Sequence, residues 1–337
     1  MTKALPTLGG TALAAGLGGL CLQLVRRHNK NAYTIMQRAA ELSDKSRYET
    51  NDHIVAIEGK YLNGFRFIPQ PRRHPGTVVV FGGSEGSPAY EQARALCAQG
   101  YEVLSLFFFG QPNQVARLAR VPLDQFDEIE AYIHTTIDHP TPITVIGTSK
   151  GAEFTAELAA NGYAVDNIAN YAPADHSYPG LDFSSREEKP SFSHRGSPVP
   201  FASFRNVGAA TFVPMMWDLI ISRPPRYRES YLAAARRSDP AAAIDLSGFR
   251  GHALFFAGEA DAMWQSEIAA TTLAGVSDTF EVFTYPGAGH LFAEDIASVG
   301  TGWEIMFGGT AAGAAQAYRQ SQVVLLDRLA RWHGTMM

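Results

Sequence analysis

The expected fold is decided by one stretch, Ile143-Thr144-Val145-Ile146-Gly147-Thr148-Ser149-Lys150-Gly151-Ala152-Glu153. An apolar, β-branched run ends in the pattern Gly-x-Ser-x-Gly and passes directly into residues that favour a helix. A strand, a sharp turn and a helix in this order form a nucleophile elbow, whose turn holds a serine in a strained conformation. Small residues at Gly147 and Gly151 let the strand and the helix approach closely. Ser149 is therefore the candidate nucleophile.

A second Gly-x-Ser-x-Gly pattern occurs at residues 82–86, where Ser84 follows the strand-like run 77–81. Position along the chain separates the two patterns, because only Ser149 is preceded by a complete succession of strand, helix, strand and helix. In a fold with a nucleophile elbow, the loop after an earlier strand helps to bind the oxyanion. Ser84 stands where such a loop belongs.

The composition is that of a globular protein with a large core: the 337 residues are 46% hydrophobic and 18% charged. The net charge of −5 provides no basic stripe, so nucleic acid is not an expected partner. The two cysteines, Cys21 and Cys97, are too few for a disulfide framework and lack metal-ligand spacing. We expect no metal and no cofactor, because the histidines form no metal-binding pair and the glycine-rich run 81–86 lacks the acidic partner of a nucleotide site.

An uncharged run of about eighteen residues, 8–25, approaches the length needed to cross a bilayer of about 30 Å. Three interpretations compete. A cleaved signal peptide would need small residues at the end of the run, and large residues stand there instead. A lipoprotein site at Cys21 would need small residues before it, where Leu20 stands. We therefore expect residues 1–30 to form an uncleaved, single-pass transmembrane anchor.

The residues around this run bear on orientation and assembly. Basic residues are more frequent after it than before it, which predicts a cytoplasmic catalytic domain by the positive-inside rule. Small residues recur at every fourth position, at Gly10, Ala14 and Gly18. Such spacing is typical of helix-dimer faces, so a homodimer is one interpretation. A glycine-rich segment without a partner is the other.

Strand-like and helix-like runs alternate through residues 76–337, which predicts one catalytic domain of the α/β class. Its sheet should be mostly parallel, with helices on both faces. Two short β-like runs before it read as an opening hairpin within a linker segment, 31–75. The expected strands are 53–58, 61–68, 77–81, 101–108, 143–146, 167–171, 252–257 and 280–285. The expected helices are 90–99, one beginning near Pro122, 152–160 and 318–332.

The partners of a catalytic serine should follow it in the chain, in the order acid and then histidine, each on a loop after a late strand. A serine hydroxyl needs a base to take its proton, and that base needs a carboxylate to orient it. The strand 252–257 leads to Asp261, and the strand 280–285 leads to His290. We predict His290 as the base and Asp261 as the acid, with Glu259 as the alternative acid.

The predicted oxyanion hole consists of two backbone N–H groups, because the oxyanion of an acyl-transfer intermediate needs preorganised donors. One is the amide of Lys150, directly after the nucleophile. The other is the amide of Ser84, in the loop after the strand 77–81. The side chains of Lys150 and Glu85 receive no chemical role.

The alternation stops at residues 175–248, a long insertion after the sixth expected strand. Charged residues and a proline interrupt its apolar cluster, so a membrane span is not expected there. We predict a cap over the active site, with Met and aromatic side chains lining a pocket for an acyl chain. The predicted pocket residues are Phe201, Phe212, Met216 and Trp217. The alternative is that they only pack the cap on the sheet.

Several motifs together resemble one known family. They are Phe81–Gly86, Ile146–Glu153, Gly258–Asp261 with Trp264, Tyr285–His290 and, in the insertion, Arg195–Phe201. This set resembles the C-terminal catalytic domain of the acyl-CoA thioester hydrolase and bile acid-CoA:amino acid N-acyltransferase family, over roughly residues 76–333. The resemblance implies an α/β-hydrolase fold and acyl transfer through a covalent acyl-enzyme.

The same resemblance bears on the reaction. The family's nucleophile is serine in the thioesterases and cysteine in the conjugating enzyme, so Ser149 favours hydrolysis. Family members commonly carry a β-sandwich domain before the catalytic one, and the segment 31–75 is too short for it. We therefore expect a membrane-anchored serine hydrolase that cleaves acyl thioesters or esters. The alternatives are a carboxylesterase, lipase or lipid deacylase on an amphiphilic membrane substrate, an acyltransferase to an amine, and an inactive membrane scaffold.

Overall fold

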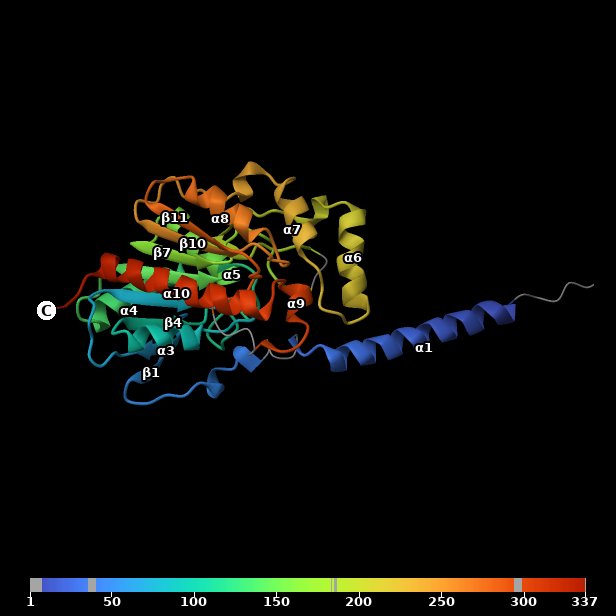
Figure 1. The fold of residues 1–337 in the computed structure, drawn as a ribbon, viewed down its shortest axis with the longest axis horizontal. Helices are drawn as coiled ribbons and strands as arrows, with labels where there is room; N and C mark the ends of the chain where they lie inside the picture. Colours follow the sequence, from blue (N-terminus) through green and yellow to red (C-terminus); the bar gives the residue numbers. More distant parts are fainter. Residues whose placement is uncertain (1–7, 36–40, 183, 185–186, 294–298, 337) are drawn as a thin grey trace, which may run out of the picture.

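The computed structural model describes residues 8–35, 41–182, 184, 187–293 and 299–336. Within them, an eight-stranded sheet forms the centre of the molecule, in the order β1-β2-β4-β3-β6-β7-β10-β11 (Figure 1). Its strands are β1 (Ile54–Glu58), β2 (Asn63–Phe67), β3 (Thr77–Phe81), β4 (Glu102–Leu106), β6 (Ile143–Thr148), β7 (Asn167–Tyr171), β10 (His252–Gly258) and β11 (Phe280–Tyr285).

The sheet is mostly parallel, because β3, β4, β6, β7, β10 and β11 all pair in parallel. Only the opening hairpin differs: β1 pairs antiparallel with β2, and β2 antiparallel with β4. Val79 of β3 lies between Leu104 and Val145, and all three are fully buried. A strand covered on both faces needs this continuous apolar sequence.

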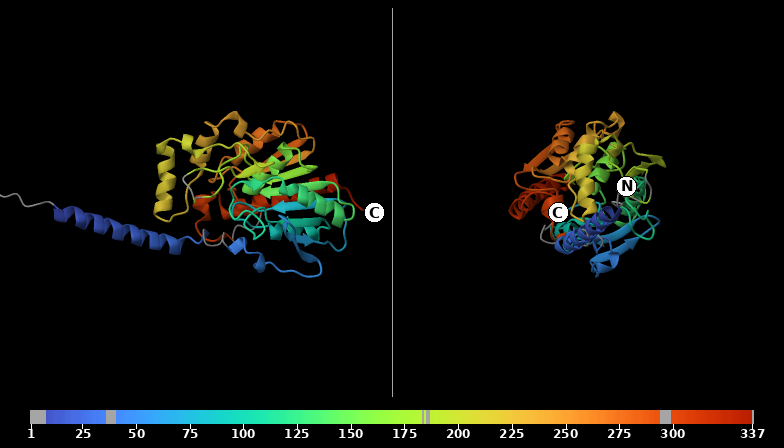
Figure 2. Two further views of the ribbon diagram at one scale, coloured as in Figure 1. Left: turned by 180° about the vertical axis from the view of Figure 1, so that it is seen from behind. Right: turned by 90° about the vertical axis from the view of Figure 1, so that its right-hand side faces the viewer.

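Helices cover both faces of the sheet, as the two further views also show (Figure 2). On one face lie α3 (Tyr90–Ala98) and α10 (Ala311–His333), which share a buried apolar cluster with Val78 and Val80. On the other face lie α4 (Gln125–Thr136), α5 (Lys150–Ala160) and α8 (Ser266–Ala274), which share a second cluster with Val79 and Val145. The predicted fold class is confirmed: the three layers and the strand order are those of the α/β-hydrolase fold.

The insertion between β7 and β10 carries its own short elements. They are β8 (Phe192–His194), β9 (Ser197–Pro198), η2 (Phe204–Asn206), α6 (Ala209–Ile220), α7 (Arg228–Ala235) and η3 (Pro240–Ala242). With β5 (Val121–Pro122), β8 and β9 form a small second sheet, so the insertion is tied to the segment before α4. Among the described residues, η1 (Lys45–Arg47) and α9 (Trp303–Met306) are further short elements outside the insertion.

The predicted transmembrane anchor corresponds to α1 (Leu8–Ala32), a helix that projects from the body (Figure 1). Its last turns are bound to the insertion: Arg26 Nε donates to the carbonyl oxygen of Ile220 at 2.6 Å, and Asn29 Nδ2 to that of Ile221 at 2.8 Å. Across the described part of the chain, no helix combines the length and the apolar character that a bilayer crossing requires.

The prediction of a single-pass membrane protein with a cytoplasmic catalytic domain is therefore wrong. The physical reason lies in the composition of α1. Gly and Ala make up much of its first half and provide little apolar surface, and its second half carries Arg26, Arg27 and Lys30. Residues 1–7 of the predicted anchor lie outside the described residues. The dimer contact through Gly10, Ala14 and Gly18 stays a prediction.

Candidate active site

Ser149 lies in a sharp turn between β6 and α5, with φ 56° and ψ −117°. This backbone conformation is strained for a residue other than glycine, and a hydrogen bond from the Ser149 amide to the carbonyl oxygen of Tyr171, at 2.9 Å, helps to hold it. The neighbouring glycines permit the turn. A Cβ atom on Gly147 would stand 2.2 Å from the carbonyl oxygen of Gly151, and one on Gly151 would stand 2.1 Å from that of Gly82.

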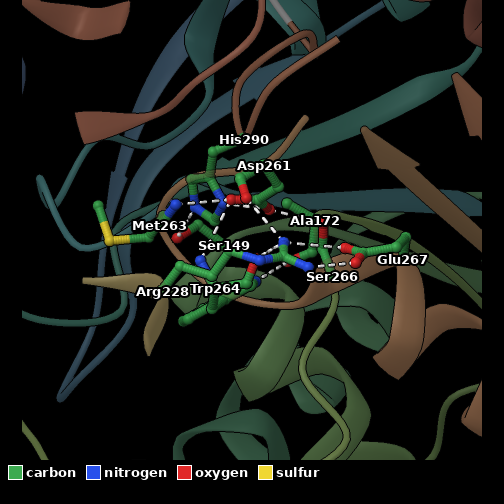
Figure 3. A network of polar contacts seen from close by, with 9 residues as sticks. All are labelled: Ser149, Ala172, Arg228, Asp261, Met263, Trp264, Ser266, Glu267 and His290. Carbon is green, nitrogen blue, oxygen red and sulfur yellow. Dashed lines mark hydrogen bonds and ion pairs between the residues drawn. The ribbon is translucent and has the colours of Figure 1, made fainter. Parts of the chain in front are cut away.

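The structure brings Ser149, His290 and Asp261 together from the ends of three different strands (Figure 3). His290 Nε2 lies 2.7 Å from Ser149 Oγ, and His290 Nδ1 lies 2.9 Å from Asp261 Oδ2. With the ring proton assigned to Nδ1, the imidazole donates to the carboxylate and accepts the serine hydroxyl proton. All three residues are buried, so these polar contacts are only weakly screened by water.

The carboxylate of Asp261 is held by four donors. Oδ1 accepts the amides of Met263 at 2.8 Å and Trp264 at 3.2 Å, and Oδ2 accepts the Ser266 hydroxyl at 2.6 Å as well as the imidazole of His290. Each oxygen is therefore fixed in place, and the orientation of the imidazole follows from it. Sequence reasoning did not identify Ser266, and no spacing pattern marks it.

Glu259, the alternative acid, lies elsewhere. It is exposed, and its carboxylate accepts a hydrogen bond from Thr284 Oγ1 at 2.9 Å. Of the two candidate carboxylates, only that of Asp261 contacts the imidazole in the described part of the chain.

Two aromatic rings enclose the imidazole of His290. The indole of Trp264 meets it edge to face at 5.1 Å, and the ring of Phe307 stacks on it at 5.7 Å. The amide of His290 donates to the carbonyl oxygen of Phe307 at 2.7 Å, which fixes the loop that carries the histidine. These contacts leave His290 1% exposed.

The loop after β3 lies against Ser149, as a Cβ atom on Gly83 would stand 3.3 Å from the Ser149 Cβ. Glu85 shapes this loop: one of its carboxylate oxygens accepts the Gly83 amide at 2.9 Å and the Ser87 hydroxyl at 2.6 Å. The Gly83 amide is thus occupied. The structure gives the amides of Ser84 and Lys150 no hydrogen-bond partner among the residues it describes, which leaves both available to an oxyanion.

The side chain of Lys150 is fully engaged in a buried network. Its ammonium donates to Glu153 Oε2 and to Ser191 Oγ, each at 2.8 Å. Glu153 also accepts the amide of Tyr178 at 3.0 Å. Burial lowers the pKa of Lys150, while the adjacent Glu153 carboxylate opposes that change. Because Tyr178 and Ser191 belong to the insertion, this network ties the first turn of α5 to the insertion.

A second buried carboxyl on α5, Glu157, leads to a prediction about stability. It accepts hydrogen bonds from Ser177 Oγ at 2.6 Å and from Asn161 Nδ2 at 3.0 Å, yet burial raises the pKa of Glu157 from 4.5 to about 7. Because the pKa of Glu157 is higher in the folded protein than in the unfolded chain, the protonated carboxyl stabilises the fold. This stabilisation is complete below pH 4.5 and is lost as the pH rises through 7.

In the wild type, ionisation of Glu157 should lower the free energy of unfolding by on the order of 3 kcal/mol between pH 4.5 and pH 8.5. We expect Glu157→Gln to lack this decrease, because the amide does not ionise. Urea unfolding at the two pH values measures the effect. Glu91→Gln, at an exposed carboxylate of α3, is the control. Parallel pH profiles for the wild type and Glu157→Gln would contradict the prediction.

The four predicted pocket residues lie in the insertion, and each is at least partly exposed. Met216 and Trp217 are 37% and 55% exposed on α6, and Phe201 and Phe212 are half-buried. A different apolar cluster adjoins His290, containing Tyr178, Tyr231, Met263 and Trp264. The acyl pocket at the four predicted residues stays a prediction, and the cluster around Trp264 is the apolar surface next to His290.

The strand order, the strained serine and the Ser149–His290–Asp261 contacts together define a class of protein. The chain is an α/β-hydrolase by fold, and its three polar residues have the arrangement of a serine hydrolase site. No metal-binding group of three or more His, Cys, Asp or Glu side chains occurs among the described residues.

Two curated mouse proteins match the sequence. Acyl-coenzyme A amino acid N-acyltransferase 1 from Mus musculus is 33% identical over 105 residues, which cover 30% of this chain and 24% of the relative. Bile acid-CoA:amino acid N-acyltransferase from Mus musculus is 23% identical over 255 residues, which cover 70% of this chain and 53% of the relative. The chain thus spans about a quarter and about half of these relatives. The matches confirm the resemblance that the motifs indicated.

Solved structures with a similar arrangement include esterases and a thioesterase. Esterase Pf2001 from Pyrococcus furiosus has a TM-score of 0.48 at 12% identity, covering 86% of this chain and 94% of that one. The type II thioesterase BorB from the borrelidin biosynthetic cluster has a TM-score of 0.42 at 13% identity, covering 82% and 97%. No protein-family model matches the chain. The fold assignment rests on the strand order and strand directions of the chain itself.

Proposed function

We propose that the protein is a serine hydrolase that cleaves acyl thioesters or esters through a covalent acyl-enzyme on Ser149. The observation that carries the proposal is the continuous chain of contacts from Ser149 Oγ to His290 Nε2 at 2.7 Å and from His290 Nδ1 to Asp261 Oδ2 at 2.9 Å. A serine hydroxyl positioned on a base that is itself oriented by a carboxylate is the arrangement that activates it as a nucleophile.

In the first half of the reaction, Ser149 Oγ attacks the acyl carbonyl carbon while His290 Nε2 takes the hydroxyl proton. The carbonyl oxygen becomes an oxyanion, which the amides of Lys150 and Ser84 would stabilise. Asp261 stabilises the imidazolium. When the tetrahedral intermediate collapses, the bond to the leaving sulfur or oxygen breaks, and the imidazolium gives its proton to the leaving group. The acyl group then remains on Ser149.

In the second half, water attacks the acyl-enzyme while His290 takes its proton, and the same oxyanion donors act again. The ester bond to Ser149 Oγ breaks, the imidazolium returns the proton to the serine, and the acid is released. The enclosure of His290 by Trp264 and Phe307 keeps this proton transfer in a region of low dielectric constant.

A second candidate function is acyl transfer to an amine. The observation in its favour is that both matched mouse proteins are named as amino acid N-acyltransferases. In that reaction an amine, rather than water, would attack the acyl-enzyme. Ser149 favours hydrolysis, because the resembling family uses cysteine in its conjugating enzyme.

The test is release of the leaving group from two matched substrate series, acyl-CoAs and p-nitrophenyl esters of the same acyl chains, with and without added glycine. Ser149→Ala is the control for turnover by the site. Serine-dependent cleavage without a glycine conjugate supports the hydrolase, and preference for one series assigns thioester or oxyester. A glycine conjugate that forms faster than free acid would support the transferase. Turnover that survives Ser149→Ala in both series contradicts both functions.

The loop after β3 provides a further prediction. We expect Glu85→Ala to lower kcat about 10- to 100-fold, because the released Gly83 amide lets the adjacent Ser84 amide move away from the oxyanion. Glu85→Gln keeps a carbonyl oxygen that can accept the Gly83 amide and the Ser87 hydroxyl, so its kcat should stay within about threefold of the wild type. Steady-state hydrolysis of a p-nitrophenyl ester measures both. Equal losses in Glu85→Ala and Glu85→Gln would show that catalysis depends on the charge of Glu85 and not on its hydrogen bonds to Gly83 and Ser87.

A further inference from the structure

The insertion reaches the acid loop, residues 259–265 between β10 and α8, through the side chain of Arg228. Arg228 is the first residue of α7. Its Nη1 donates to the main-chain oxygens of Asp261 at 2.7 Å and Trp264 at 2.9 Å. The guanidinium also contacts both carboxylate oxygens of Glu267, in the first turn of α8 (Figure 3). One side chain thus joins the insertion to both ends of the turn that carries Asp261.

A second side chain of α7 contacts the same loop. Tyr231 stands one turn after Arg228, so the two lie on one face of the helix. The ring of Tyr231 packs edge to face on the indole of Trp264 at 5.4 Å, and that indole packs on the imidazole of His290 at 5.1 Å. Helix α7 therefore contacts the surroundings of the acid and those of the base.

The other side of the acid loop is fixed to the catalytic domain through its main chain. The amide of Ala260 donates to the carbonyl oxygen of Ala288 at 2.9 Å, and the amide of Ala262 donates to that of Phe307 at 3.1 Å. The loop is thus held between the histidine loop and α7. The main-chain amide of Arg228 also donates to the carbonyl oxygen of Ala262 at 3.2 Å. The guanidinium adds the contacts with the main-chain oxygens of Asp261 and Trp264, so its loss would weaken the attachment of α7 to the outer side of the loop.

We propose that Arg228 is a positioning residue, which fixes Asp261 and through it His290, so that the placement of α7 sets the reactivity of Ser149. The inference rests on the proposed serine hydrolase function. A planar guanidinium can bind a carboxylate with two nitrogens while it donates to main-chain oxygens, and a lysine ammonium cannot reproduce this geometry. Displacement of a catalytic group by about 1 Å can cost on the order of 10²-fold in rate.

The main variant is Arg228→Gln. A cleft of about 730 Å³ adjoins Arg228 and the acid loop, so the shorter side chain does not have to fit into a closed core. We expect kcat to fall about 10- to 100-fold while KM stays within about threefold. The acid limb of the kcat/KM profile should move to lower pH, because a displaced carboxylate stabilises the imidazolium less.

Arg228→Lys should recover only part of kcat. Arg236→Gln, an exposed arginine directly after α7, is the matched control and should behave as the wild type.

The decisive comparison repeats Arg228→Gln in the Asp261→Asn background. If Arg228 acts through the carboxylate of Asp261, its substitution should cost less than about threefold once that carboxylate is gone. A purely structural role would give the same fold-loss in both backgrounds, and that result would overturn the inference.

The other outcomes are also distinct. Wild-type protein without Ser149-dependent turnover would refute the proposed function itself. Active wild-type protein with an unchanged kcat in Arg228→Gln would refute only the role of Arg228. Circular dichroism and the midpoint of thermal unfolding report whether the variant folds. If Arg228→Gln fails to fold, Arg228→Lys and Glu267→Gln carry the test, and kcat values equal to that of Arg236→Gln in both would contradict the inference.

Discussion

Replacement of Ser149 by alanine is expected to lower kcat for ester or thioester cleavage by about 10⁴-fold or more. The substitution removes the oxygen that attacks the carbonyl carbon, so no acyl-enzyme can form. The Ser149 amide, which donates to Tyr171, and the adjacent Lys150 amide stay in place, so the fold and substrate binding should be retained. Single-turnover measurement of leaving-group release gives the rate, and circular dichroism checks the fold.

Ser84→Ala is the matched control, because Ser84 stands in the second Gly-x-Ser-x-Gly pattern. Its predicted role uses only the main-chain amide, which alanine keeps. We expect its kcat to stay within about threefold of the wild type. Loss of activity in Ser84→Ala with retention in Ser149→Ala would reverse the assignment of the two serines.

The second large effect is expected for Asp261→Asn, with a fall in kcat of about 10⁴-fold. The surroundings of Asp261 determine how the asparagine must lie. The amides of Met263 and Trp264 both donate to the position of Oδ1, so the amide oxygen should occupy it. The NH₂ group then faces His290 Nδ1, which must become an acceptor. The proton moves to Nε2, and the imidazole can no longer take the serine proton.

The measurement is kcat for Asp261→Asn beside Glu259→Gln, which alters the exposed carboxylate bonded to Thr284 and should leave kcat within about threefold of the wild type. Folding is checked by the midpoint of thermal unfolding, since Asn keeps the size of the buried side chain. Equal activity in the two variants would mean that Asp261 does not orient the base. A larger loss in Glu259→Gln would make Glu259 the acid.

The elbow and the parallel sheet could be predicted because each depends on local sequence. A continuous apolar run such as 77–81 requires burial on both faces, and Gly147 and Gly151 stand where any Cβ would meet the backbone. The late loops carrying Asp261 and His290 followed from the order of strands. The contacts of Asp261 and His290 with Ser149 depend on how strands distant in the sequence pair. The sequence indicates these contacts only through the order in which the strands and their loops follow one another.

Other features could not be predicted, because their signals are weak or non-local. Helix α8 buries small residues such as Ala269 and Ala270, so its sequence lacks the clear apolar spacing that predicts an amphipathic helix. The prediction of a membrane anchor is wrong because the run 8–25 is long and uncharged, but its Gly and Ala residues provide little apolar surface. The contact of Arg228 with the acid loop spans more than thirty residues of sequence and has no motif.

The insertion contributes side chains to the surroundings of Ser149, Asp261 and His290. It supplies Tyr178 and Ser191 to the buried Lys150 network, and Arg228 and Tyr231 to the acid loop and Trp264. Both Lys150, directly after Ser149, and the loop that carries Asp261 are therefore in contact with the insertion. We expect substitutions in α7 to change catalysis more than substitutions in the exposed face of α6, where Trp217 lies.

A nucleophilic serine at position 149 can be demonstrated by labelling with a fluorophosphonate, an electrophile that an activated serine attacks at phosphorus with loss of fluoride. Intact-protein mass spectrometry and peptide mapping would be applied to the wild type, Ser149→Ala and Ser84→Ala. We expect one adduct per chain, located on Ser149, present in Ser84→Ala and absent in Ser149→Ala. A wild-type protein that takes up no label, or takes it up at another residue, would contradict this expectation.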